Sequence, residues 1–118
     1  MAITKEYRSA RGRAAREKGK RGEREVAKLF KDAGFADAKR TAQFCGKTGD
    51  AADVDGVPGL HIEVKRVERE AVRKWMDQAA RDAEVGGQGN IPVVVHRKSG
   101  DEWLVTLKFE DFLEIMKG

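Results

Sequence analysis

The stretch DVDGVPGLHIEVKR, residues 53–66, constrains the fold of this chain more than any other. Its second half alternates apolar and polar residues, and this period of two predicts a β-strand with one face in the core. Asp55, Gly56, Pro58 and Gly59 supply turn chemistry before that strand, so the stretch predicts two neighbouring strands joined by a turn. The chain must therefore place charged side chains on one face of its best strand.

Alternation assigns Ile62 and Val64 to the core face of this strand, and Glu63 and Lys65 to the opposite face. Asp53 lies on that opposite side of the preceding strand, so a tight turn would place its carboxylate near that of Glu63. A solvated face with cross-strand charge pairing is the alternative, because the outer faces of antiparallel sheets are commonly charged.

Three segments repeat apolar residues at helical spacing and predict amphipathic helices. They are residues 22–35, 70–85 and 109–118, with the sequences GEREVAKLFKDAGF, EAVRKWMDQAARDAEV and FEDFLEIMKG. In the last segment the apolar residues are expected to face inward; they are Phe109, Phe112, Leu113 and Met116.

Strands are predicted at residues 35–41, on both sides of the turn within 53–66, and at 91–97 and 102–108, the last two as a hairpin. The order is therefore helix, three strands, helix, two strands, helix. This order predicts a fold of the α/β (α+β) class, with a central mixed five-stranded sheet flanked by helices.

Basic residues are concentrated before the first strand. Of 24 Lys and Arg residues in the 118-residue chain, eight lie between Lys5 and Arg21, against two acidic residues. The length predicts a single domain, residues 19–118, preceded by a basic arm, residues 1–18, that could be helical or unstructured by itself. Such an arm suits a polyanion as its partner.

Cys45 is the single cysteine, so neither an internal disulfide nor a cysteine-based zinc site is expected. No stretch approaches the ~20 apolar residues that a membrane span needs. Both features predict a reducing, cytoplasmic setting without a membrane partner.

Glu23 is a third acidic residue with a predicted inward position. It lies on the same helical side as the apolar residues that follow it, whereas Glu25 lies about 200° away. A buried carboxylate costs several kcal/mol unless a cation accompanies it, so Glu23, Asp53 and Glu63 indicate a shared cation. The alternative is that Glu23 is a first-turn acid favoured by the helix dipole.

Oxygen ligands select a hard cation such as Mg²⁺, for which Mn²⁺ can substitute. The candidate ligands are Asp53, Glu63, Glu23 and a backbone carbonyl, that of Val64. Lys65 beside them would hold or deprotonate a water, or neutralise charge that develops in the transition state. A cation, a lysine and a basic chain together indicate phosphodiester hydrolysis.

At these residues the sequence resembles the PD-(D/E)XK nucleases, whose signature is an Asp on one strand and Glu-X-Lys on the next. Asp53 and the run from Glu63 to Lys65 match it. The chain looks most like the archaeal Holliday junction resolvases and related phage-encoded nucleases, whose first helix opens with Gly before Glu-Arg-Glu, as in KRGEREVAKLF. The resemblance runs from about Lys18 to the C-terminus.

The resemblance implies that Glu23 is the helix carboxylate of the site, and that Gln78, on the helix after Glu-X-Lys, belongs to it. Two positions depart from the pattern of this family. Ala52 replaces the Pro that usually precedes the strand Asp, and Asp55 could compete with Asp53 as the ligand. Asp53 is preferred, because Asp55 belongs to the turn.

A wider set of residues is expected to contact the DNA backbone. It comprises Arg13, Arg16, Lys18, Lys20, Arg21, Arg24, Arg40, Thr41, Lys47 and Arg66. For Arg40 and Thr41 a solvated strand end is the alternative. His61 is expected at the surface, and Trp75 and Trp103 in the core.

By resemblance, the expected function is a Mg²⁺-dependent DNA endonuclease that cuts four-way junctions in recombination or repair. It would act as a homodimer in a bacterial or phage-infected cell, near the nucleoid, and leave 5′-phosphate and 3′-hydroxyl ends. The alternatives are a nuclease of the same fold for other branched, nicked or single-stranded DNA, a DNA-binding module without catalysis, and an enzyme acting on RNA.

Overall fold

The computed structural model describes residues 5–41 and 51–118. In chain order its elements are α1 (Lys5–Asp32), β1 (Lys39–Arg40), β2 (Val54–Asp55), β3 (Leu60–Arg66), α2 (Val72–Gly86), β4 (Ile91–Arg97), β5 (Leu104–Thr106) and α3 (Phe109–Lys117). This is the predicted order of elements, although β1, β2 and β5 are only two or three residues long. Cys45 and Lys47 lie outside the described residues.

The strands form one mixed sheet in the order β1-β2-β3-β4-β5. Strands β3 and β4 are parallel, with Leu60 beside Ile91 and Arg66 beside Arg97, and the other neighbours are antiparallel. The parallel pair is possible because α2 carries the chain back along the sheet between the two strands. The predicted fold class and the mixed five-stranded sheet are confirmed.

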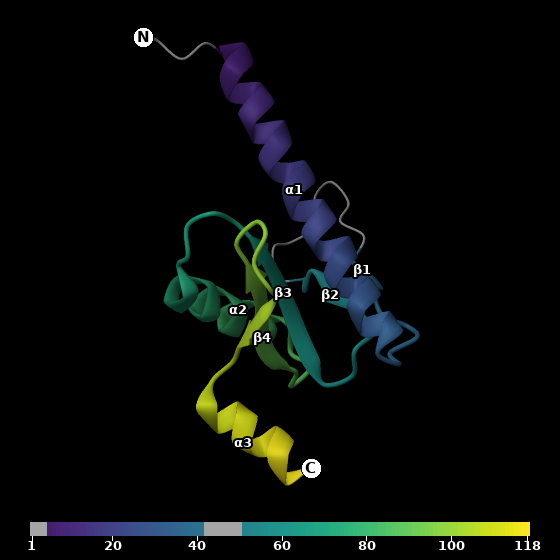
Figure 1. The fold of residues 1–118 in the computed structure, drawn as a ribbon. Coiled ribbons are helices and arrows are strands. Elements are labelled where there is room, and N and C mark those ends of the chain that lie inside the picture. The colour runs from purple at the N-terminus through teal and green to yellow at the C-terminus, as the bar shows by residue number, and fades with distance from the viewer. Residues whose placement is uncertain (1–4, 42–50) are drawn as a thin grey trace.

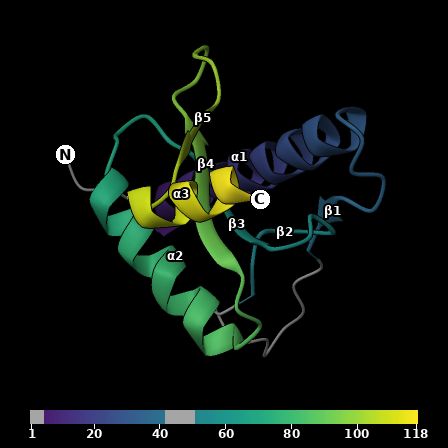
Figure 2. The ribbon, with the colours of Figure 1, turned by 90° about the horizontal axis from the view of Figure 1, so that it is seen from below.

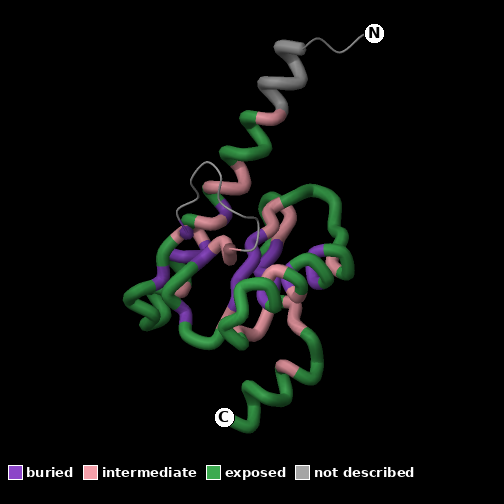
Figure 3. The backbone as a smooth tube through the Cα atoms, turned by 180° about the vertical axis from the view of Figure 1, so that it is seen from behind, coloured by how far each residue is buried: buried purple, intermediate pink, exposed green. Residues whose placement is uncertain are grey.

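Helices α1 and α2 lie on opposite faces of the sheet (Figure 1 and Figure 2). The larger apolar cluster is on the α1 side, where Val26 packs with Ile62. On the α2 side, Trp75 and Ala79 pack with Val94. Figure 3 shows the buried residues concentrated along the sheet and the helix sides that face it. The central strands are therefore covered on both faces.

Helix α1 is 28 residues long and extends through the basic segment back to Lys5, so residues 5–18 are helical. Its N-terminal part projects beyond the sheet (Figure 1). Gly22 allows the rest to lie close to β3, because a Cβ at Gly22 would be 3.2 Å from the Cβ of Arg66. In the described parts of the chain, no helix is long and apolar enough to cross a membrane.

The connection between β2 and β3 spans residues 56–59, which makes it longer than the two-residue turn that the sequence suggested. Gly56 has a φ of 87°, and a Cβ there would lie 2.0 Å from the carbonyl oxygen of Asp37. This position therefore requires glycine. The turn sets Val54 opposite Ile62, which fixes the register of the two strands that carry the candidate carboxylates.

The expectation that the apolar residues of α3 face inward is wrong. Phe109 and Met116 are 71% and 67% exposed, Phe112 and Leu113 are 43% and 41% exposed, and the helix has no buried residue. Helix α3 follows β5 and stands away from both faces of the sheet (Figure 1). Its apolar spacing correctly predicts a helix, but the sheet does not cover it.

Candidate active site

Asp53 and Glu63 meet at the junction of β2 and β3. The Asp53 N–H donates to the carbonyl of Ile62 over 2.8 Å, and its carbonyl accepts from the Thr41 N–H over 2.9 Å. The Val64 N–H donates to Asp53 Oδ2 over 2.9 Å, and the Asp53 and Glu63 side chains share a hydrogen bond when one carboxyl is protonated. The backbone on both sides thus holds the two carboxyl groups together.

Asp53 has a strongly perturbed acidity. Burial and the negative charge of Glu63 raise the pKa of the Asp53 carboxyl from 3.8 to about 8, with a smaller contribution from Glu23 and an opposing one from the Val64 N–H. At neutral pH this carboxyl therefore holds a proton unless a cation takes its place. Asp55, the competing ligand, is exposed on β2.

Glu23 faces inward from α1, as its helical position predicts. Its side chain is only 15% exposed, and its Oε2 accepts a hydrogen bond from Arg40 Nε over 2.6 Å. Arg40 thereby balances the Glu23 charge from β1. The Glu23 charge also makes a small contribution to the raised pKa of the Asp53 carboxyl, so Glu23 lies on the side of α1 that is nearer to the two strand acids.

Glu25 contacts a different part of the molecule, because it lies on the other side of α1 from Glu23. It accepts hydrogen bonds from Trp103 Nε1 over 3.1 Å and from Arg97 over 3.2 Å. The Arg97 guanidinium also lies 4.9 Å from the centre of the Trp103 ring. Glu25 therefore ties α1 to the end of β4, and of the two acids in the Glu-Arg-Glu run only Glu23 lies by the carboxylates.

His61 is buried rather than at the surface, so the expectation for this residue is wrong. It is 6% exposed because α2 covers its face of β3, and its Nε2 lies 2.9 Å from Glu63 Oε1. Asp82 of α2 completes a cluster in which one ligand atom from each of His61, Glu63 and Asp82 lies within 4.8 Å of the others. Sequence reasoning missed Asp82, although it falls on the α2 stripe seven residues after Trp75.

Lys65 and Gln78 differ in their positions. Lys65 is half-buried on β3 beside His96, on the Glu63 side of the strand by alternation. Gln78 is exposed on α2, off the buried side formed by Trp75, Met76, Ala79 and Ala83. The helix residue that lies at Glu63 is Asp82, and a catalytic role for Gln78 stays a prediction.

The residues expected to bind DNA form two groups. Arg13, Arg16, Arg21 and Arg24 are exposed along α1. Three of the others form ion pairs: Lys18 with Glu68 over 2.6 Å, Lys20 with Glu17 over 3.7 Å, and Arg40 with Glu23. Thr41 is buried and Arg66 is half-buried. The exposed arginines follow α1 toward the carboxylates.

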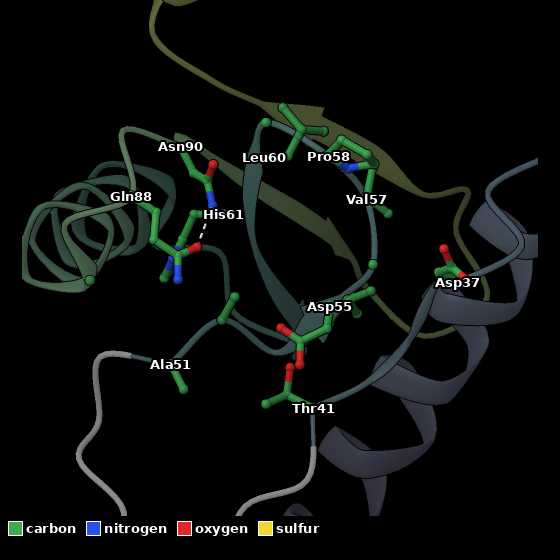
Figure 4. A pocket seen from close by; sticks show the side chains of 15 residues that line it. Asp37, Thr41, Ala51, Asp55, Val57, Pro58, Leu60, His61, Gln88 and Asn90 are labelled. Carbon is green, nitrogen blue, oxygen red and sulfur yellow. Dashed lines mark hydrogen bonds between the residues drawn. The ribbon is translucent and has the colours of Figure 1, made fainter.

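A polar cavity of about 690 Å³ adjoins the cluster on the side of the β2–β3 turn, and His61 is one of its lining residues. Figure 4 shows Thr41 and Asp55 pointing toward each other on one side, with Gln88 and Asn90 on another. The buried Thr41 hydroxyl has no hydrogen-bond partner within the described segments. The cavity thus offers polar groups and reaches the acidic cluster through His61.

The donor set fits a divalent cation. Asp53, Glu63 and Glu23 offer carboxylate oxygens, which suit Mg²⁺ or Mn²⁺. The raised pKa of Asp53 indicates that the protein alone does not balance these buried charges. His61 and Asp82 extend the set around Glu63 with one nitrogen and one further oxygen.

The mixed sheet flanked by helices, with Asp53 directly before β2 and Glu-X-Lys on β3, defines a nuclease of the PD-(D/E)XK class. The family model described as "Phage putative PDDEXK endonuclease" matches residues 14–117, and the chain belongs to this family. Membership in an endonuclease family implies DNA as the substrate and is typical of proteins that use a divalent metal.

Among solved structures, the chain is similar to Hjc from Archaeoglobus fulgidus, a Holliday junction resolvase from an archaeal hyperthermophile. The two share 24% sequence identity with a TM-score of 0.55, over 75% of this chain and 76% of Hjc. This similarity demonstrates a common fold. No curated protein matches the chain.

Proposed function

We propose that this chain is a Mg²⁺-dependent endonuclease that cuts branched DNA, with four-way junctions as its preferred substrate. The observation that carries the proposal is the buried Asp53 and Glu63 pair, whose charges need a cation, next to Lys65 on the same strand. The fold shared with a Holliday junction resolvase supports the choice of substrate. A four-way junction has two symmetric cleavage points, so the enzyme would act as a homodimer.

Asp53, Glu63 and the Val64 carbonyl would hold the cation, and Glu23 would join them if Arg40 turned away. When bound, the cation supplies positive charge to the scissile phosphate and lowers the pKa of a coordinated water. The Lys65 ammonium orients the attacking water or neutralises charge on the phosphate in the transition state. Arg40, released from Glu23, would be free to contact a phosphate oxygen.

The exposed arginines of α1 would hold the DNA backbone. Arg13, Arg16, Arg21 and Arg24 follow one helix that leads to the site, and contacts of this kind carry no sequence information. Binding through them releases counterions, so affinity would fall steeply as salt rises. Lys18, Lys20, Thr41, Lys47 and Arg66 remain predicted contacts, as does Gln78 in the site.

The test is cleavage of a labelled four-way junction beside a linear duplex of the same sequence, with Mg²⁺ or EDTA. Wild type is compared with Lys65→Ala and with Lys74→Ala, a control lysine exposed on α2. Paired, symmetric cuts in the junction are expected from wild type and Lys74→Ala. EDTA and Lys65→Ala should each remove them.

Other results point elsewhere. Cleavage of flaps, nicks or single strands in preference to the junction would keep the nuclease and reject the junction as its substrate. Binding of DNA without cleavage under any divalent metal would reject catalysis and leave a DNA-binding module. Preference for matched RNA over DNA would reject the substrate class.

A further inference from the structure

Helix α3 carries a group of large apolar side chains that are exposed. Phe109, Phe112, Leu113 and Met116 recur at i, i+3, i+4 and i+7, which places them on one side of the helix, here called the α3 face. Their exposed fractions run from 41% to 71%. The Phe109 and Phe112 rings stack on each other, with 6.4 Å between their centroids, rather than on the sheet. Four large apolar side chains therefore stand in solvent together.

A helix of this length needs a covering partner. Helix α3 has nine residues and no buried one, and isolated helices shorter than about 12–15 residues are marginal in water. Its N-cap residue, Lys108, makes no side-chain capping bond. Acids in the first turn and Lys117 in the last turn interact favourably with the helix dipole, but these interactions add little stability. Burial of the α3 face would supply the missing stability.

The area of the α3 face suits a protein partner. Its four side chains expose roughly 400 Å², about half of the ~800 Å² that each partner buries in a standard interface. A surface of this composition does not suit a DNA backbone.

The charges along α3 indicate that a second copy of this chain is the partner that binds the α3 face. Glu110 lies in the first turn beside the α3 face and Lys117 lies in the last, whereas Asp111, about 200° from Phe109, points away from that face. If two copies of α3 pack in antiparallel orientation, the first turn of each lies beside the last turn of the other. Because Glu110 and Lys117 flank the α3 face on the same side, Lys117 of one copy then lies near Glu110 of the second, at both ends of the contact. Lys117 is exposed and pairs only loosely, over 3.6 Å, with Glu114 of its own helix.

We propose that the α3 face is the dimer interface of this protein, formed by two α3 helices packed antiparallel about a two-fold axis. Each copy buries the apolar side of α3 against the same side of the other, and the complementary charges at the helix ends set the orientation. The use of this dimer on a two-fold DNA junction rests on the proposed function. The interface itself does not depend on catalysis.

The test is the mass of the full chain in solution, by sedimentation equilibrium over a concentration series, without DNA and with EDTA present. Wild type is expected to be a dimer. Phe109→Glu and Met116→Glu should each weaken the dimer by at least 100-fold, roughly the loss for a charge buried without a partner. Val85→Glu is the matched control: Val85 is 70% exposed on α2, outside the α3 face, and its substitution should leave the mass unchanged.

A charge reversal tests the orientation with variants that keep the apolar residues. Lys117→Glu should weaken the dimer, and combining it with Glu110→Lys should restore it. A monomeric wild type at every concentration, or a dimer unaffected by Phe109→Glu, would overturn the proposal. Failure of the double variant to recover would overturn the antiparallel arrangement. Because no DNA is cut, these outcomes are independent of nuclease activity.

Discussion

The two faces of β3 are both covered by a helix, yet they bury opposite kinds of chemistry. On the α1 side, Ile62 is fully buried and packs in the larger apolar cluster. On the α2 side, Glu63 and His61 are each 6% exposed, and the carboxylate lies beside those of Asp53 and Asp82. One face of β3 therefore stabilises the fold, and the other face destabilises it.

The difference shows how to recognise a site inside a strand. Apolar burial lowers the free energy of the folded state, whereas crowded buried acids raise it unless protons or a cation compensate. A small domain keeps such a cluster when it serves chemistry, since an apolar replacement would be at least as stable. Substitutions on the two faces should thus separate stability from activity.

The largest effect is expected from Asp53→Asn, on the acidic side. Loss of the ligand charge should reduce Mg²⁺-dependent DNA cleavage about 1,000-fold, which corresponds to roughly 4 kcal/mol of activation free energy. Single-turnover cleavage measures it. Asp55→Asn, two residues away on the exposed side of β2, is the control and should stay within a few-fold of wild type. The reverse result would make Asp55 the ligand.

Ile62→Ala breaks the apolar face. It removes a fully buried side chain and should lower the free energy of unfolding by about 2–5 kcal/mol. Urea denaturation measures this loss, and Val105→Ala, at a side chain that is 58% exposed, should change little. Below its unfolding transition, Ile62→Ala should still bind Mg²⁺ like wild type. Loss of Mg²⁺ binding by the folded variant would argue that the two faces are not separable.

His61→Ala tests the support of Glu63 on the acidic face. Removing the imidazole that lies 2.9 Å from Glu63 should weaken cleavage about 10-fold to 100-fold, as for other residues that orient a ligand. His61→Gln, whose amide can reach the same oxygen, should recover part of the rate. If the two variants are equally impaired, His61 acts through more than this contact, such as binding a cation itself.

A pH dependence of stability without metal is also expected from the acidic face. The folded-state pKa of Asp53, about 8, exceeds its ordinary value of 3.8, so the folded protein binds the additional proton between these values. Its stabilising contribution is complete below pH 4 and is lost as the pH rises through 8. The difference in melting temperature between Asp53→Asn and wild type in EDTA should therefore grow over this range, where 1 kcal/mol equals roughly 4–8 °C.

Comparing the two proteins isolates Asp53. The pKa of His96 is lowered by burial, but this residue contributes equally to wild type and variant and cancels in the difference. Mg²⁺ should remove most of the wild-type deficit at pH 8. A difference that does not change with pH would mean that Asp53 is charged throughout.

Much of the site was predictable from short-range patterns. The alternation through 60–66 indicated which side of β3 holds Glu63 and Lys65, and helical spacing distinguished Glu23 from Glu25. Turn chemistry favoured Asp53 over Asp55 as the ligand, and this choice stays a prediction: Asp55 is the last residue of β2 and is exposed. These inferences succeed because a strand or helix determines where its own side chains point.

Contacts between elements were harder to predict from the sequence. The burial of His61 depends on α2 lying over that end of β3, and the position of Asp82 depends on how α2 is rotated about its axis. Gln78, assigned by resemblance, is exposed for the same reason. The length of α1 was left open, since basic residues are compatible with a helix or with a chain free of structure.

The sequence by itself determined the order of the elements, the mixed sheet and the acids that share one side of two strands, because local periodicity specifies which side of each element is apolar. Only the tertiary structure decided which neighbour covers each side. The apolar side of α2 packs on the sheet, whereas that of α3, with equally regular spacing, remains exposed. Periodicity shows which side of an element is apolar, but packing geometry decides which neighbour, if any, buries that side.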